Sequence, residues 1–439
     1  MMRNRTYRKR RTLLGSIGVG ALGATAGCLD LEFLESDEPR RFEAEELEPI
    51  LSTEAPNVAR PAPVQPGEGT IASAVDRLET LIDAVPDPLE ADDVPNETVR
   101  KEIDRTREIA QTRREELTEL PSRFHRLRRS IAARRSAGEA ATAFEVVSGD
   151  RSRNAVETER DEVQERLSNR RSELEYVGDE PQRLLVLASR LETEVASANR
   201  RLETQPRDES TDVLESGAIG GATERAAATI EFLTALERRH EDRLRDERSF
   251  DGRFQAALDQ SLEAIDAAAV PDESTDPAAV VDADVSGTVA EDVLYHGLTW
   301  TVGPVEQTRN AAASGDTARA LRNACAFEYS YRALETIREQ IADGSHRALE
   351  SVGDVRDVRE TTLERAADAP FDPDEPTIGG DLLADRYDRF EIIDNRVRGS
   401  IERGRKTTLN HVYAEYVVLG AQFSALPEAV AALEERLEA

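Results

Sequence analysis

Residues 181–204 read PQRLLVLASRLETEVASANRRLET, and their apolar side chains recur every three or four positions. The positions on this stripe are Leu184, Leu187, Leu191, Val195, Ala198 and Leu202. Residues three and four apart share one face of an α-helix, so the spacing predicts a helix with a narrow apolar stripe. Stripes of this kind recur along the chain and determine the expected fold.

The stretch just before it has the same heptad-like pattern. Its apolar positions are Val156, Val163, Leu167, Leu174 and Val177. A turn at residues 178–181 separates the two stretches, which predicts an antiparallel coiled-coil-like hairpin over residues 150–204. A helix of about 25 residues is roughly 38 Å long. Such a hairpin could project as a rod or pack onto the rest of the chain, and the sequence leaves both possibilities open.

Helical stripes also occur before and after this hairpin, whereas no run alternates with a period of two for long enough to predict a strand. The expected fold is therefore all-α, with long helices, the hairpin and a C-terminal helical bundle. Asn96 is a predicted N-cap, and Pro121 predicts a break after which Ser122 caps a new helix. In the last third, the expected helices span residues 287–312, 315–343, 346–369, 379–403, 407–425 and 427–438.

Composition divides the chain after residue 27 into four segments. Residues 28–69 are acidic and contain six prolines, which predicts a flexible tether with a short helix near residues 42–51. Residues 70–270 carry the long helical stripes, and the acidic, proline-containing residues 271–286 form the predicted linker. Most aromatic residues lie in 287–439, so we expect this segment to be the most compactly packed bundle.

The chain is strongly acidic, with a formal net charge of −31. Lys9, Lys101 and Lys406 are its only lysines, so nearly every cation is an arginine. Abundant carboxylates with arginine in place of lysine indicate adaptation to molar salt, where the Debye length of about 3 Å screens self-repulsion. Nucleic acids are not expected as partners, because their phosphates require clustered cations.

The first 27 residues begin with six cations and no acidic residue. They continue with an apolar stretch that is too short and too rich in glycine for a transmembrane helix of about 20 residues. Arg10 and Arg11 precede this stretch, and Cys28 directly follows Gly27. These residues resemble the export signal and lipobox of twin-arginine-exported lipoprotein precursors, which are abundant in salt-loving archaea.

This resemblance implies removal of residues 1–27 as a signal peptide and a covalent lipid on Cys28. It also implies export of the folded protein and anchoring at the cell membrane on the extracellular side. Separately, we expect no other cofactor. The mature chain would then have a net charge of −37, because the signal peptide contains six cations and no anion. Cys325 is the only other cysteine, so no intramolecular disulfide would form. The alternative is an uncleaved signal anchor in which Cys28 has no role.

One short motif indicates a possible metal site. Gly344, Ser345 and His346 are followed by Glu350, which is similar to the Gly-x-His-x-x-Glu signature of imelysin-like proteins. Those proteins are extracytoplasmic, all-α and associated with metal uptake. In this chain the glutamate follows the histidine by four residues instead of three, although both spacings place the pair on one helix face. The alternative is structural: Gly344 ends one helix and Ser345 caps the next.

His411 and Glu415 have the same four-residue spacing, so two helices could each present a histidine and a carboxylate. His346, Glu350, His411 and Glu415 are therefore the candidate metal ligands. Glu237 and His240 form a single Glu-x-x-His, whereas a di-iron bundle needs two such pairs. His240 lies between Leu236 and Leu244 in an apolar stripe, which favours a structural role.

No catalytic residues can be assigned, because the sequence contains neither a Gly-x-Ser-x-Gly elbow nor a nucleophile with an identifiable base. The sequence therefore predicts a membrane-anchored, extracytoplasmic helical lipoprotein that is not an enzyme. Its expected role is binding, spacing or interaction at the cell surface, through a protein partner or self-association of its helices. The alternative is a helical receptor for a metal or small ligand, similar in role to imelysin-like proteins.

Overall fold

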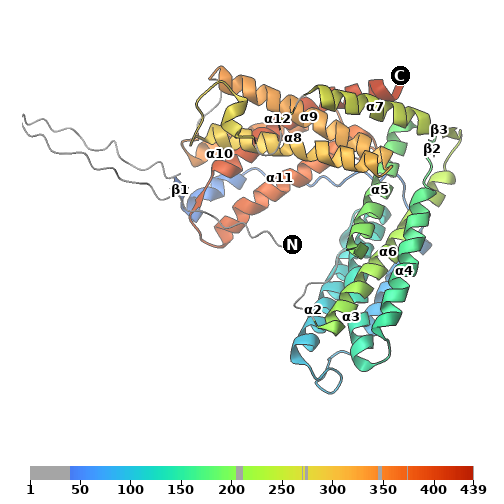
Figure 1. Cartoon of the computed structure of the whole chain (residues 1–439). Helices are drawn as coiled ribbons and strands as arrows, with labels where there is room; N and C mark the ends of the chain where they lie inside the picture. Colours follow the sequence, from blue (N-terminus) through green and yellow to red (C-terminus); the bar gives the residue numbers. More distant parts are fainter. Residues whose placement is uncertain are drawn as a thin grey trace, which may run out of the picture. The chain divides into compact units, whose positions relative to one another are not determined.

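The computed structural model describes residues 40–203, 211–268, 270–271, 275–344, 349–372 and 374–438. Within these ranges the chain forms twelve α-helices and three short 3-10 helices, which confirms the all-α prediction (Figure 1). The only strands in these ranges are two residues long, and they form two pairs. β1 (Arg41–Phe42) pairs with β4 (Thr407–Thr408), and β2 (Val177–Gly178) pairs with β3 (Arg248–Ser249), both antiparallel.

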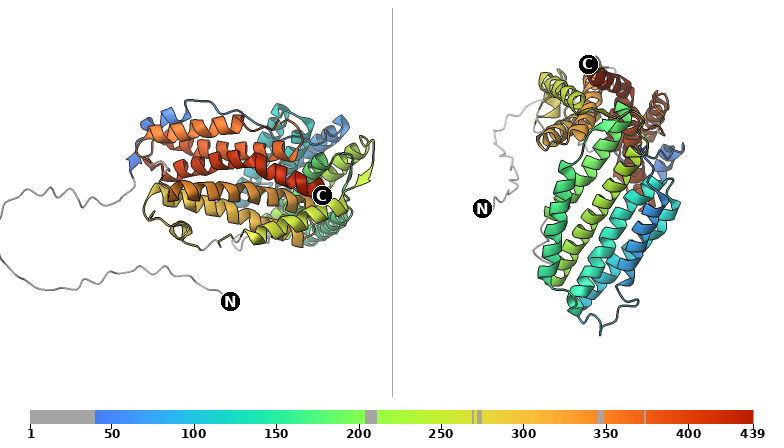
Figure 2. Two further views of the ribbon diagram at one scale, coloured as in Figure 1. Left: turned by 90° about the horizontal axis from the view of Figure 1, so that it is seen from above. Right: turned by 90° about the vertical axis from the view of Figure 1, so that its right-hand side faces the viewer.

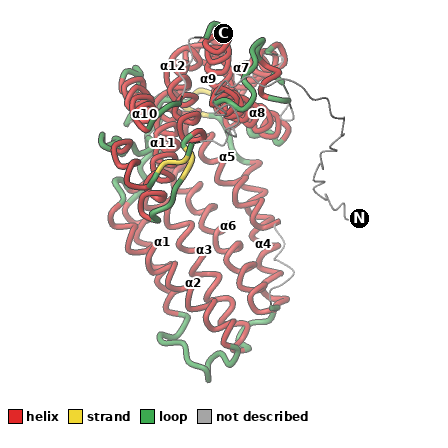
Figure 3. The backbone as a smooth tube through the Cα atoms, turned by 90° about the vertical axis from the view of Figure 1, so that its left-hand side faces the viewer, coloured by secondary structure: helices red, strands yellow, loops and turns green. Residues whose placement is uncertain are grey.

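Six helices form a first bundle. They are α1 (Glu68–Asp83), α2 (Glu97–Glu116), α3 (Arg123–Ser148), α4 (Arg153–Ser172), α5 (Pro181–Glu203) and α6 (Asp212–Glu241). The central pair is α3 and α6; α1 and α2 pack on α3, while α4 and α5 pack on α6 (Figure 3). The short 3-10 helix η2 (Leu117–Glu119) separates α2 from α3.

The predicted caps of these helices are confirmed. The Asn96 side chain accepts hydrogen bonds from the Thr98 and Val99 amides, at 3.0 and 3.2 Å. The Ser122 hydroxyl accepts one from the His125 amide after the break at Pro121. The backbone can leave the helix at these points because the cap side chains satisfy amides that lack intrahelical partners.

The close contact between α3 and α6 depends on glycine. A Cβ atom added to Gly217 of α6 would lie 2.8 Å from the Glu139 carbonyl oxygen of α3. One added to Gly220 would overlap the side chain of Thr142. Only residues without a side chain fit at these two positions, which lets the two backbones approach closely.

The two helices of the predicted hairpin are present as α4 and α5, but their coiled-coil-like pairing is not confirmed. Both α4 and α5 pack on α6, and α5 also contacts α9 (Thr317–Ala342) of the second bundle. Leu185 and Val186, which lie outside the predicted stripe, are fully buried. A helix buried on several faces packs into a bundle instead of projecting, and the hairpin is therefore part of the six-helix bundle.

Helix α7 (Asp251–Ala267) and five further helices form a second bundle (Figures 1 and 2). The five are α8 (Val289–Ala313), α9, α10 (Val352–Ala367), α11 (Ile378–Glu402) and α12 (Asn410–Glu438). Helix α12 contacts all the others. It continues through Pro427, where the sequence predicts a break, because Leu426, Ala429 and Val430 anchor both sides of the proline in the core.

The predicted linker at residues 271–286 is wrong as a domain boundary. Helix α7 precedes it but packs on α9 and α12, with Phe250 and Phe254 buried in the second core. The 3-10 helix η3 (Pro277–Val280) packs on α8, and Val285 is buried in the same cluster. The boundary therefore lies between α6 and α7. The proline and acidic residues correctly indicated an interruption between helices. This interruption lies inside the second bundle and does not separate two bundles.

The predicted tether also needs correction over residues 40–67. The expected short helix exists as the 3-10 helix η1 (Ala44–Leu51), but it packs on α10 and α11 with Leu47 and Ile50 fully buried. Downstream, Arg60 forms ion pairs with Asp385 and Asp388 of α11, at 2.5 and 2.7 Å. Apolar side chains between the prolines provide enough burial to order this segment. Residues 28–39 of the predicted tether lie outside the described residues.

Buried charged groups join the two bundles where α5 meets α9 and α11. Asp381 of α11 is fully buried and forms ion pairs with Arg190 of α5 and Arg322 of α9. Burial acts to raise the pKa of Asp381, but the two guanidinium groups hold it below its usual value. Nearby, the buried Glu192 of α5 accepts hydrogen bonds from the Ala318 and Arg319 amides, at 3.4 and 2.6 Å. Its carboxyl group thereby caps α9.

Among the described residues, α12 is the one helix long and apolar enough to cross a membrane, and 61% of its apolar window is buried in the bundle. This burial matches its position as the central helix of the second core.

Candidate functional site

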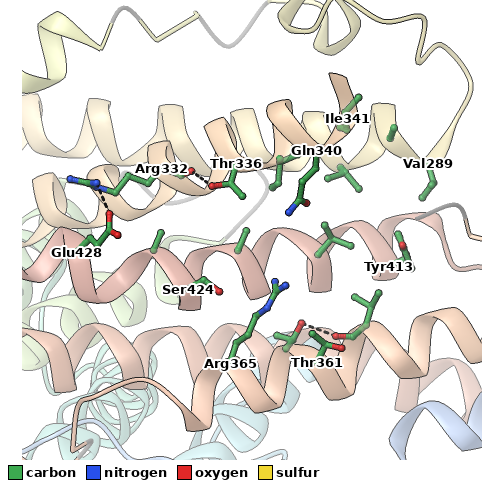
Figure 4. A pocket seen from close by; sticks show the side chains of 18 residues that line it. Val289, Arg332, Thr336, Gln340, Ile341, Thr361, Arg365, Tyr413, Ser424 and Glu428 are labelled. Carbon is green, nitrogen blue, oxygen red and sulfur yellow. Dashed lines mark hydrogen bonds and ion pairs between the residues drawn. The ribbon is translucent and has the colours of Figure 1, made fainter. Parts of the chain in front are cut away.

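A groove of about 420 Å³ lies over α12 in the second bundle, between α8 and α9 on one side and α10 on the other (Figure 4). Its apolar lining comes from all four helices: Val289, Ala290, Val293, Ile337, Ile341, Val358, Val417, Ala421 and Ala425. Its polar lining comes from α9, α10 and α12: Arg332, Thr336, Gln340, Thr361, Thr362, Arg365, Tyr413, Ser424 and Glu428.

Small residues of α12 create this hollow. Ala421, Ser424 and Ala425 are spaced so that they lie along one side of the helix, where larger side chains would fill the space. A Cβ atom at Gly420 would lie 2.9 Å from the Thr362 hydroxyl and 3.1 Å from a terminal nitrogen of Arg365. Gly420 thus lets the side chains of α10 cross closely over α12.

Arg365 differs from the other arginine of the groove. Arg332 forms ion pairs with Glu328 and Glu428, both at 2.9 Å. Arg365 forms no ion pair with any residue in the described part of the chain. Figure 4 shows Arg365 extending from α10, and Gln340 from α9, into the space over α12. The groove therefore combines apolar walls with one guanidinium group that has no ion-pair partner among the described residues.

Of the four candidate metal ligands, the three that the structure describes are not gathered into a metal site. Glu415 is buried and forms ion pairs with Arg389 and Arg396 of α11. Glu350 is exposed, its carbonyl oxygen accepts a hydrogen bond from Arg40, and His346 lies outside the described residues. In the ranges that the structure describes, no three His, Cys, Asp or Glu residues are arranged to hold a metal ion.

His411 instead faces α8. Its Nδ1 lies 3.3 Å from Nε2 of His296 and 3.5 Å from a carboxylate oxygen of Asp292. Burial and the neighbouring His411 lower the pKa of His296 to about 4, although Asp292 opposes the shift. His296 is therefore neutral at physiological pH, and sequence reasoning missed it because no spacing rule links residues 115 positions apart.

The other singled-out residues have structural environments. His240 contacts the Val177 carbonyl oxygen through Nε2 at 2.7 Å, and Glu237 is paired with Arg170. Cys325 is a buried free thiol whose pKa is raised by burial, which makes it a poor nucleophile. Cys28, Arg10 and Arg11 lie outside the described residues.

Sequence reasoning also missed the groove, although the small residues of α12 were visible. The larger apolar residues near the end of α12, such as Leu426 and Val430, are buried in the core instead. The opposing wall, with Arg365, comes from another helix, and only the fold shows that these two faces meet.

Two family models match the chain. Residues 70–247 match a family described as Domain of unknown function (DUF8262), and residues 251–435 match Domain of unknown function (DUF8264). The division between them coincides with the structural boundary between α6 and α7. No curated protein and no solved structure matches the chain.

Proposed function

We propose that this protein is a non-catalytic binding protein, anchored by a lipid on the extracellular side of the cell membrane, whose second bundle holds a small amphipathic anion. The observation that carries the proposal is the groove over α12, with Arg365 unpaired among the described residues and extending into it. Its volume of about 420 Å³ lies within the usual range for small-ligand pockets.

The lining defines the chemistry of the ligand. A guanidinium group presents paired N–H donors that match a carboxylate or phosphate. The aliphatic walls favour burial of a hydrocarbon body beside that head group. The chain has 88 acidic residues and 57 lysines and arginines, so most arginines have carboxylates available nearby. An arginine without an ion-pair partner among the described residues is therefore a candidate for binding an anionic ligand.

Octanoate is a suitable probe, with octanol and octylamine as uncharged and cationic analogues. Titration calorimetry in molar salt should show that octanoate binds and octylamine does not. Arg365→Gln should weaken octanoate binding by about tenfold or more, since charge-assisted hydrogen bonds contribute about 1.5–3 kcal/mol.

The matched control is Arg356→Gln, which removes an exposed arginine of α10 that pairs with Asp357 outside the groove. Ala425→Leu should also reduce binding by filling the space. Equal affinity of the protein and Arg365→Gln for octanoate, or no binding of any probe, would refute the proposed site.

The membrane anchor rests on the signal-peptide resemblance of residues 1–28. Replacing Cys28 with Ser should release the protein from membranes or leave it unprocessed, as cell fractionation and mass spectrometry would show. Unchanged membrane retention and processing would rule out lipidation at this cysteine.

A specific surface also supports an interaction role. Tyr295 and Ile392 are the two large apolar residues exposed in the described ranges, at 52% and 50%. Tyr295 lies on α8 together with Trp300, the sole tryptophan, and Ile392 lies on α11 together with Arg389. The Arg389 guanidinium lies over the Trp300 ring at 4.4 Å. Tyr, Trp and Arg dominate protein interfaces. If a partner or second copy binds here, Ile392→Glu should abolish cross-linking from membranes, while Glu391→Gln should not.

A further inference from the structure

A second and larger hollow lies in the first bundle. This groove has a volume of about 950 Å³ and is lined by residues of α2, α3, α4, α5 and α6. It shares no residue with the groove over α12, and it belongs to the other bundle. An argument about its ligand is therefore independent of the function proposed above.

The charge of this groove is opposite to that of the chain. Its cationic lining residues are Lys101, Arg105, Arg135, Arg160 and Arg201. Its acidic lining residues are Glu102, Glu139 and Glu203. Five cations and three carboxylates leave a formal charge of +2, whereas the whole chain has −31. A random sample of this acidic surface would carry more carboxylates than cations.

Several of these cations are available to a ligand. Arg201 forms no ion pair with any residue that the structure describes. Arg135 has one long contact, 3.5 Å, with Glu139 on its own helix. Arg160 pairs with its neighbour Asp161, which does not line the groove. Three guanidinium groups thus approach one hollow from α3, α4 and α5.

Arg135 and Arg201 also act electrostatically on a neighbouring arginine, Arg225. Burial lowers the pKa of Arg225 on α6, and although Glu194 opposes the shift, Arg201 and Arg135 contribute to it. Repulsion between like charges that are not fully neutralised has this effect on a neighbouring arginine. An anion bound between these groups would relieve the repulsion.

Small residues make up much of the remaining lining: Ala140 and Ala143 of α3, and Gly217, Ala218 and Ala222 of α6. Their short side chains leave more room for a ligand than larger ones would. Thr98 and Gln164 add neutral groups that hydrogen-bond to oxygen-rich ligands.

We propose that this groove binds a small polyvalent anion, with two or more carboxylate, sulfate or phosphate groups held by Arg135, Arg160 and Arg201. Arginine fits this role because its planar fork binds such groups through two parallel hydrogen bonds. A volume of about 950 Å³ suits a molecule of ordinary ligand size. Several arginines from different helices favour a ligand with several charged groups over a single-charge ion.

Titration calorimetry with the purified full chain tests the proposal, using tripolyphosphate, citrate and inorganic sulfate over a series of salt concentrations. We expect tripolyphosphate or citrate to bind at least about tenfold more tightly than sulfate, and binding to weaken as salt increases. A preference between the first two probes would distinguish a phosphorylated ligand from a polycarboxylate.

The double variant Arg135→Gln/Arg201→Gln should reduce affinity for the better probe by at least about tenfold. Arg166→Gln is the control, since it removes an exposed arginine of α4 that does not line the groove. Circular dichroism should show unchanged helix content in both. Equal loss in the control, or binding of long dextran sulfate without any of the short probes, would overturn the proposal. Octanoate binding should be the same in all these proteins, which separates this site from the groove over α12.

Discussion

Glu192 shows how one side chain couples the two bundles. Its carboxyl group is 2% exposed and accepts hydrogen bonds from the first turn of α9 and from the Tyr176 hydroxyl, the latter at 2.6 Å. Burial raises the pKa of Glu192 to about 7, although these hydrogen bonds act to lower it. The group therefore changes charge near neutral pH inside the contact between α5 and α9.

The direction of the resulting pH dependence follows from linkage. Between about pH 4.5 and 7 the folded state keeps the Glu192 proton and the unfolded state loses it, so stability falls as pH rises through this range. The expected fall attributable to Glu192 is about 3 kcal/mol. Urea unfolding at several pH values should show that Glu192→Gln removes this component. Glu180→Gln, an exposed carboxyl just before α5, should leave it; an identical pH profile for both variants would contradict the assignment.

Nothing in the sequence distinguishes Glu192 from the other acidic residues of the chain. Its role depends on the position of the α9 N-terminus, which is more than one hundred residues away. Arg365 and His296 were missed for the same reason. By contrast, the caps Asn96 and Ser122 were predictable, because a cap acts within its own helix turn.

At the scale of helices, the close contact of α3 with α6 gives a sharp stability test. Gly220→Ala places a methyl group where the Thr142 side chain lies, so we expect a loss of about 1–3 kcal/mol in the free energy of unfolding. Gly69→Ala in α1 is the control, because no atom lies within 4 Å of the added carbon. Gly69→Ala should instead increase the free energy of unfolding by about 0.5–1 kcal/mol. Urea denaturation measures both, and effects of the same sign would argue against this contact.

The helices themselves were largely predictable, because their apolar stripes encode them locally. The way in which the hairpin packs was not predictable. A heptad-like stripe suggested two helices pairing with each other, but the continuous run Leu184–Ala188 is buried. That run was the better indicator, since a helix that is apolar on several sides has neighbours on several sides. The segment before α1 was predicted to be flexible because of its prolines. That prediction gave too little weight to apolar residues such as Leu47 and Ile50.

For the whole molecule, the ion pairs of Asp381 should determine whether the bundles unfold together. Asp381→Ala leaves Arg190 and Arg322 buried without their shared carboxylate, and breaking such a pair costs about 3–5 kcal/mol. Asp388→Ala is the control, since it removes a half-exposed partner of Arg60. Scanning calorimetry should show a marked loss of stability in the first variant and little change in the second. Similar melting of both would show that this contact is dispensable.

The division into bundles was only partly visible in the sequence. Most aromatic residues lie in the last third, which was predicted to form its own bundle, but Phe250 and Phe254 already belong to that core. The boundary was instead predicted at residues 271–286, because they are acidic and contain prolines. Composition reports where helices stop, whereas a boundary depends on which helices share a core.

The packing of η1 on α10 and α11 has a consequence for biosynthesis. Arg40 bonds to Glu350, 310 positions later, and the whole first bundle is encoded between these partners. At a synthesis rate of about 5–20 residues per second, the early segment waits for roughly 15–60 seconds before its partners are made. The first bundle can fold on the ribosome during this interval. The second bundle can form only when translation is nearly complete.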